Sequence, residues 1–276
     1  MDKSAKNQID HKTIIKMLDE FDNYSTKFSR NAIPDDINKS ILWREGGWLM
    51  RGLFYHMRSL IIEYFEFGFM VKEGLEKKAD IISIYATNSP NFTYPLHSIV
   101  FLSKIALDKL RDFLAPTFIT PYNQLPKSIT GFAKGNTDCP IYKKIFQDND
   151  INYLIDLRNC YMHYRPMICS DTAHIYKEDT DESLFEELEN IHKPLGPLAR
   201  AYYRIDEGDK IVFNMYLPDK IFDRTGSNKS LAKFSYSTKK LLLPTMFKFM
   251  QKVSLYIDEA LNLMINTKDR VYTYSK

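Results

Sequence analysis

The chain has 276 residues, a formal net charge of +3 and a hydrophobic content of 44%, which is enough apolar material for one large domain or two small ones. Its 10 glycines are few and its aromatic content is 14%, a composition that argues against a β-rich or phosphate-loop fold and favours long helices. The small net charge excludes a strongly basic nucleic-acid-binding protein, so any RNA site would be a local patch.

Neither a secretion signal nor a membrane segment is visible in the sequence. The first residues are polar, and no stretch reaches the roughly 18 uncharged apolar residues of a membrane span. Cys139, Cys160 and Cys169 are odd in number and lack Cys-x-x-Cys spacing, which is typical of reduced thiols. We therefore expect a soluble, cytoplasmic protein without a cofactor. Zinc held by Cys160, His163 and Cys169 is a weaker alternative, because these residues supply only three ligands.

Apolar side chains at helical spacing predict three helices in the first half of the chain. The first and third end before a proline, which disfavours helical geometry in the residue that precedes it. The second has a broad apolar face, as expected of a central helix, and its pattern permits an extension to residue 87. The predicted helices cover residues 12 to 29, 48 to 71 and 95 to 115, with a loop over residues 88 to 94.

A long loop is expected over residues 116 to 140, which are rich in proline and lack apolar order. It carries Lys127 and Lys134, with no acidic residue before Asp138. Two interpretations remain open: the loop borders an anionic ligand, or it is a surface connection. A short helix over residues 141 to 146 follows.

The next helix, expected over residues 151 to 164, carries the most informative residues. Asn149 or Asp150 is its expected N-cap. Arg158 falls on its apolar side, so the guanidinium must meet a carboxylate, for which Glu63 and Glu66 are candidates, or face a groove or subunit interface that receives an anion. The predicted core-facing side is formed by Ile151, Leu154, Ile155 and Met162.

The C-terminal part combines a hairpin with a last helix. Residues 201 to 205 and 210 to 217 alternate in polarity around a glycine-containing turn, which predicts a β-hairpin with Ile211, Phe213, Met215 and Leu217 on one face. The hairpin belongs to an expected insertion over about residues 167 to 230. The last helix is expected from residue 238 or 244 to 266, with Pro244 in its first turn. A flexible tail over residues 267 to 276 follows.

The order Arg158-Asn159-x-x-x-His163 at the end of a helix resembles the signature of the HEPN family, small helical domains of bacterial toxins and antiviral systems. The resemblance implies a mainly α, HEPN-like up-and-down bundle, with residues 1 to 276 as a single domain. It further implies a metal-independent endoribonuclease of toxin or phage-defence type, which acts on RNA as a homodimer paired through the motif helix and has a cognate antitoxin as a possible partner. A looser pattern at Arg51 to His56 lacks the Asn.

Arg, Asn and His suffice for RNA cleavage through the ribose 2′-OH. His163 can transfer the protons and Arg158 can neutralise the negative charge that develops on the phosphorane, while Asn159 can orient the imidazole or the scissile phosphate. Since Arg158 and His163 differ in azimuth by about 140°, a two-fold dimer would help to complete the site. Tyr161, Tyr164 and Arg165 either contact the RNA or simply pack. The alternative function is a catalytically inactive helical module that binds RNA, a nucleotide or a protein.

Overall fold

The computed structural model describes residues 11–30, 35, 37–74, 81–85, 89–114, 128–129, 139–163, 172–178, 180, 199–206, 210–218, 220–222, 233–235 and 240–264. This part of the chain is mainly helical, as predicted, with six α-helices and two small β-sheets. Contacts divide the chain into two compact units, described separately here. The helical unit comprises Ile15–Tyr55, Ser98–Ile155 and Phe247–Lys276, and the sheet unit comprises Met1–Ile14, His56–His97 and Asp156–Met246.

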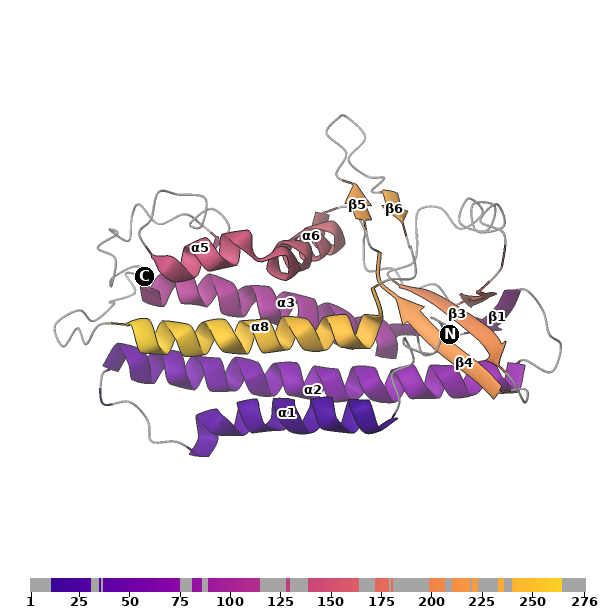
Figure 1. Cartoon of the computed structure of the whole chain (residues 1–276), viewed down its shortest axis with the longest axis horizontal. Coiled ribbons are helices and arrows are strands. Elements are labelled where there is room, and N and C mark those ends of the chain that lie inside the picture. The colour runs from indigo at the N-terminus through magenta and orange to yellow at the C-terminus, as the bar shows by residue number, and fades with distance from the viewer. Residues whose placement is uncertain are drawn as a thin grey trace, which may run out of the picture. The chain divides into compact units, whose positions relative to one another are not determined.

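Long helices build the helical unit, and several of them continue into the sheet unit. Figure 1 shows α2 running antiparallel to α1 and α3. The ring of Phe21 on α1 stacks on Phe54 of α2 with centroids 5.7 Å apart. A Cβ at Gly52 of α2 would lie 3.3 Å from Leu102 on α3, so these two helices approach closely at the glycine. The described helices are α1 (His11–Arg30), α2 (Ile37–Gly74), α3 (Ser89–Leu114), α5 (Pro140–Gln147), α6 (Asn149–His163) and α8 (Leu242–Leu263).

The core of the helical unit is formed by the apolar stripes that the sequence predicts. On α8 buried residues recur, mostly in pairs, every three or four positions. Pro244 lies in the first turn of this helix, as expected. None of the described helices is both long and apolar enough to cross a membrane. Representative buried side chains of this core are Leu53, Leu107, Leu110, Ile145, Ile151, Met250, Val253 and Ile257.

The sheet unit contains a four-stranded sheet in the order β1-β2-β3-β4. β3 and β4 form the predicted hairpin, in which Arg200 pairs with Tyr216 and Asp206 with Lys210. β2 pairs parallel to β3 and antiparallel to β1. The strands are β1 (Ile81–Tyr85), β2 (Thr172–Lys177), β3 (Arg200–Asp206) and β4 (Lys210–Tyr216), and a separate two-stranded sheet pairs β5 (Lys220–Phe222) with β6 (Lys233–Ser235).

Both faces of β4 are covered, although its sequence alternation predicts one apolar face. On one face Phe213 lies against α2: its ring centroid is 5.3 Å from that of Tyr64, and its carbonyl accepts a hydrogen bond from the Tyr64 hydroxyl at 3.4 Å. On the other, Tyr216 joins a buried cluster with Tyr176 and Tyr202. β4 therefore has packing partners on both faces of the sheet.

Three predicted boundaries are wrong. α2 begins at Ile37 rather than near residue 48, because its polar first turns still follow helical periodicity, with Leu42 and Trp43 buried. The permitted extension to residue 87 does not occur; Ile81–Tyr85 is rich in β-branched residues and pairs with β2. The expected loop over residues 88 to 94 is largely helical, because Pro90 stands at the start of α3, where a missing N–H is tolerated.

Candidate functional site on helix α6

Asp148 starts the motif helix α6. Its Oδ1 accepts hydrogen bonds from the backbone N–H groups of Asp150 at 3.0 Å and Ile151 at 3.3 Å. These bonds satisfy donors that have no partner within the helix, which is the role of an N-cap. The predicted N-caps, Asn149 and Asp150, are therefore wrong by one or two positions, since the helix already begins at Asn149.

The second oxygen of Asp148 fixes this helix start to α8. Oδ2 accepts hydrogen bonds from Lys252 Nζ at 2.8 Å and from the Tyr256 hydroxyl at 2.7 Å. Burial of Asp148 acts to raise its pKa, but the hydrogen bonds from Lys252, Tyr256 and the Ile151 N–H, with the charge of Lys252, bring the pKa below the ordinary value. Two further ion pairs join this region to α8: Asp150 of α6 binds Lys248, and Lys144 of α5 binds Glu259, each at 2.9 Å.

The buried stripe of α6 differs from the predicted one towards the helix C-terminus. Ile151, Leu154, Leu157 and Tyr161 are buried, whereas Met162 is 52% exposed. The first two steps of this stripe are three residues each, shorter than a helical turn of 3.6 residues, so the buried side rotates around the helix. Assigning Met162 to the core was therefore wrong, and the side chain presents an apolar group on the surface of the motif helix.

Arg158 and Asn159 are joined to each other. Nη1 of Arg158 donates a hydrogen bond to Oδ1 of Asn159 at 3.1 Å, and both residues are half-buried. Among the described residues, no carboxylate lies within ion-pair distance of Arg158. Burial and the charge of neighbouring Glu66 raise the pKa of Glu63, the opposite of what a bound guanidinium would do. The core ion pair considered between Arg158 and these glutamates is not formed.

His97 on α3 is a residue of this region that sequence reasoning missed. Its buried ring lies against the buried ring of Tyr161, with centroids 4.5 Å apart and an interplanar angle of 42°. Burial lowers the pKa of His97 to about 4, so the imidazole is neutral at ordinary pH. The only signal in the sequence is that His97 lies next to Leu96 and three residues before Val100, both of which belong to the apolar stripe of α3. The contact favours packing over RNA stacking as the role of Tyr161.

Of the remaining predicted site residues, the structure describes only the backbone of His163. His163 is the last residue of α6, five positions after Arg158, a separation of about 7.5 Å along the helix axis; its side chain lies outside the described part of the chain. Tyr164, Arg165, Lys127 and Lys134 also lie outside it. No group of three or more potential metal ligands occurs among the described side chains, which include none of Cys160, His163 and Cys169.

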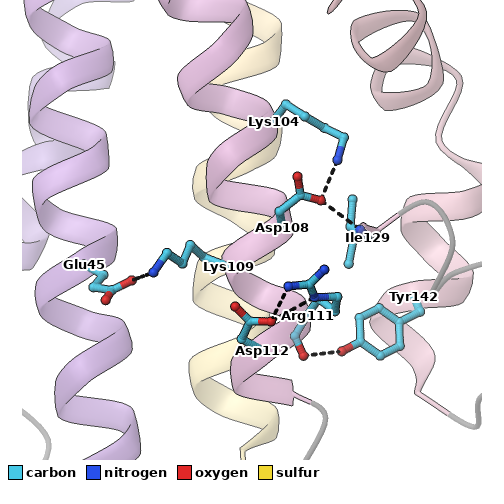
Figure 2. A network of polar contacts seen from close by, with 8 residues as sticks. All are labelled: Glu45, Lys104, Asp108, Lys109, Arg111, Asp112, Ile129 and Tyr142. Atoms are coloured by element: carbon cyan, nitrogen blue, oxygen red, sulfur yellow. Dashed lines mark hydrogen bonds and ion pairs between the residues drawn. The ribbon is translucent and has the colours of Figure 1, made fainter. Parts of the chain in front are cut away.

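A charged network in the helical unit joins α3 to the segments that carry Ile129 and Tyr142 (Figure 2). Asp108 binds Lys104 and accepts a hydrogen bond from the backbone N–H of Ile129 at 2.8 Å. Arg111 binds Asp112 at 2.6 Å, and the carbonyl of Arg111 accepts a hydrogen bond from the Tyr142 hydroxyl. The charges compensate one another within the cluster, which indicates that it anchors Ile129 and α5 to α3.

Comparisons of the chain with protein-family models, curated proteins and solved structures returned no match. The resemblance to the HEPN family is therefore carried by Arg158, Asn159 and His163 together with the mainly helical fold.

Proposed function

We propose that the protein is a metal-independent endoribonuclease that cleaves single-stranded RNA, of the toxin or antiviral-defence type. The observation that carries this proposal is the state of Arg158. Its guanidinium is oriented by Asn159 rather than neutralised by a carboxylate within the described part of the chain, and it precedes His163 on one helix. A half-buried cation that is oriented but keeps its charge available suits a phosphate that gains charge during reaction.

The proposed reaction is an internal transesterification. The ribose 2′-oxygen attacks the adjacent phosphorus, the bond from phosphorus to the 5′-oxygen breaks, and a 2′,3′-cyclic phosphate remains. The 2′-OH loses a proton to a neutral imidazole and the 5′-oxygen gains one from an imidazolium, which are the two roles of His163. Arg158 stabilises the additional negative charge on the phosphoryl oxygens.

A second subunit would complete the site. Residues five apart on an ideal α-helix differ in azimuth by about 140°, so Arg158 and His163 of one chain are not aimed at one point by the helix alone. A two-fold axis beside α6 would bring His163 of one chain towards Arg158 of the other.

The alternative is a catalytically inactive helical module that binds RNA, a nucleotide or a protein. The burial of Tyr161 is the observation in its favour, because a ring that lies against His97 does not stack on a base.

The test is cleavage of single-stranded RNA by the purified protein in excess EDTA, with the products analysed for 2′,3′-cyclic phosphate ends. His163→Ala removes the proton transfers and should lower the rate by roughly 10²–10⁴-fold. Arg158→Ala should also abolish cleavage. It should lower the free energy of unfolding by only about 1 kcal/mol, because one hydrogen bond to Asn159 is lost and no buried carboxylate is stranded.

His56→Ala is the matched control, because His56 belongs to the second Arg-x-x-x-x-His sequence and lies half-buried on α2. We expect it to cleave like the wild type. Loss of activity in His56→Ala with full activity in His163→Ala would mean that the wrong motif was chosen. If no RNA is cut by any form of the protein, the inactive-module alternative takes its place.

A further inference from the structure

The outward face of α2 carries large apolar side chains at intervals of seven residues. Ile41, Trp48 and Tyr55 are 39%, 71% and 67% exposed. Because seven residues are nearly two helical turns, successive side chains shift by only about 20° around the helix. All three therefore lie on one narrow stripe, about 10.5 Å apart along the axis. Two aromatic rings exposed to this degree, in register on a single helix, are an unusual feature of a protein surface.

Arginines accompany this stripe with the same period. Arg44 and Arg51 follow Ile41 and Trp48 by three residues, so each lies beside its apolar neighbour on the helix surface. Both are exposed, and within the described part of the chain neither has a carboxylate at ion-pair distance. Glu45, the acidic residue next to Arg44, binds Lys109 of α3 at 3.1 Å, as Figure 2 shows. We call Ile41, Arg44, Trp48, Arg51 and Tyr55 the Trp48 face.

The pattern is unsuited to a second helix as the occupant. A coiled-coil seam needs apolar residues at two positions of each heptad, three or four residues apart. On α2 the positions three after the apolar residues hold Arg44 and Arg51, and the positions four after them hold Glu45 and Gly52. Cations in place of the second apolar row oppose the approach of an apolar helix but complement a polyanion.

We infer that the Trp48 face binds single-stranded nucleic acid, with Trp48 and Tyr55 stacking on bases and the arginines contacting phosphates. Every base has a face for stacking, and alternating aromatic and cationic side chains are the usual means of holding a single strand. The choice of RNA rests on the proposed function.

Tryptophan fluorescence gives the first test. The chain has two tryptophans; Trp43 is 8% exposed and Trp48 is 71% exposed, so a stacked base should quench Trp48 and leave Trp43 as an internal reference. Titration with a short single-stranded RNA should quench the emission that iodide can reach. Trp48→Phe should abolish most of this quenching. Unchanged quenching in Trp48→Phe would overturn the inference.

Binding measurements give the second test, with fluorescence anisotropy of labelled RNA and the His163→Ala protein as the background. Trp48→Ala should weaken binding by roughly 5- to 150-fold, the usual effect of losing one stacked ring. The double variant Arg44→Gln/Arg51→Gln should make the fall of log K with log salt concentration less steep, by about 1.4 in slope. Each phosphate contact on a single strand contributes about 0.7 to this slope. A duplex should bind more weakly than a single strand, because its bases are not free to stack.

Matched variants away from the face serve as controls. Phe146→Ala removes a 47% exposed ring from α5, and Lys16→Gln/Lys143→Gln removes two exposed charges from α1 and α5. Both should bind RNA like the parent protein. Equal losses in the control and face variants, or equal affinity for duplex and single strand, would overturn the inference. So would a change of oligomeric state in Trp48→Ala without any effect on RNA binding, which would assign the face to a second copy of the chain.

The binding and cleavage results separate the two proposals. Binding that depends on the Trp48 face in a protein that cuts no RNA refutes the ribonuclease and keeps the face. Cleavage that is unaffected by all variants of the Trp48 face supports the ribonuclease and refutes the role of the face in binding RNA.

Discussion

Asp148 uses both oxygens of one carboxylate for different structural tasks. Oδ1 caps α6, and Oδ2 binds Lys252 and Tyr256 on α8. The side chain of Asp148 is only 7% exposed, so water cannot replace these partners. The start of the motif helix is therefore fixed by a residue that carries no catalytic chemistry.

Replacing Asp148 should be more damaging than replacing any residue of the motif. Asp148→Ala should lower the free energy of unfolding by about 2–4 kcal/mol, because an N-cap and charged hydrogen bonds are lost together. Asp148→Asn keeps an oxygen that can cap the helix, so it should lower the free energy of unfolding by less than Asp148→Ala. Because the folded-state pKa of Asp148 is below its ordinary value of 3.8, its contribution is complete above about pH 4 and is lost as the pH falls through the folded-state pKa. Urea denaturation followed by circular dichroism measures all of these quantities.

Asp150→Asn is the control for this prediction. Its partner Lys248 is 55% exposed, so its loss should change stability by at most about 1 kcal/mol. Equal losses in Asp150→Asn and Asp148→Ala would contradict the role assigned to Asp148.

At the scale of elements, α3 and α6 meet in the sheet unit through His97 and Tyr161. The buried imidazole is held in its neutral form, and its pKa is lowered to about 4. Tyr161 lies between Arg158 and His163 in the sequence, so its contact with His97 supports the part of α6 that carries the motif. His97 and Tyr161 are far apart in sequence, so no local pattern predicts that their rings pack together.

Acidification should weaken this contact. Below pH 6.5 the unfolded chain protonates His97 while the folded chain resists protonation until about pH 4, so stability is lost as the pH falls through this interval, by up to about 3 kcal/mol. His97→Leu should remove this part of the pH dependence, as measured by thermal unfolding across the interval. His56→Gln is the control and should retain most of it, since His56 is only half-buried. An unchanged pH profile in His97→Leu would refute the assignment.

At the scale of the whole molecule, α6 offers features that suit a subunit interface. Met162 is 52% exposed on the motif helix, and Arg158 carries a charge that no carboxylate of the described residues compensates. An exposed methionine beside an oriented cation is suited to a contact repeated about a two-fold axis.

We therefore predict a homodimer through α6 at tens of micromolar, measured by sedimentation. Met162→Glu should shift the protein to monomer, because two charges would be brought together across the axis. Leu255→Glu, at a 45% exposed position of α8, should leave the dimer intact. A monomeric wild-type protein at this concentration would refute the interface and, with it, the proposal that a second subunit completes the site.

The sequence by itself determined the helices with long apolar stripes and the β3–β4 hairpin. It also placed Arg158, Asn159 and His163 at the end of one helix. These features depend on residues close in the chain, so local periodicity and turn chemistry are sufficient to predict them. The Trp48 face has the same origin, but a seven-residue period alone does not say which side of α2 is buried.

Tertiary structure decided the rest. Ile81–Tyr85 became a strand because Thr172–Lys177 pairs with it, and no local pattern near residue 81 contains that partner. Met162 became exposed because the buried stripe rotates along α6, and Asp148 became the cap because Lys252 and Tyr256 hold its other oxygen. Each of these outcomes depends on groups distant in sequence, whose contact energies exceed the small local preferences that a sequence pattern expresses.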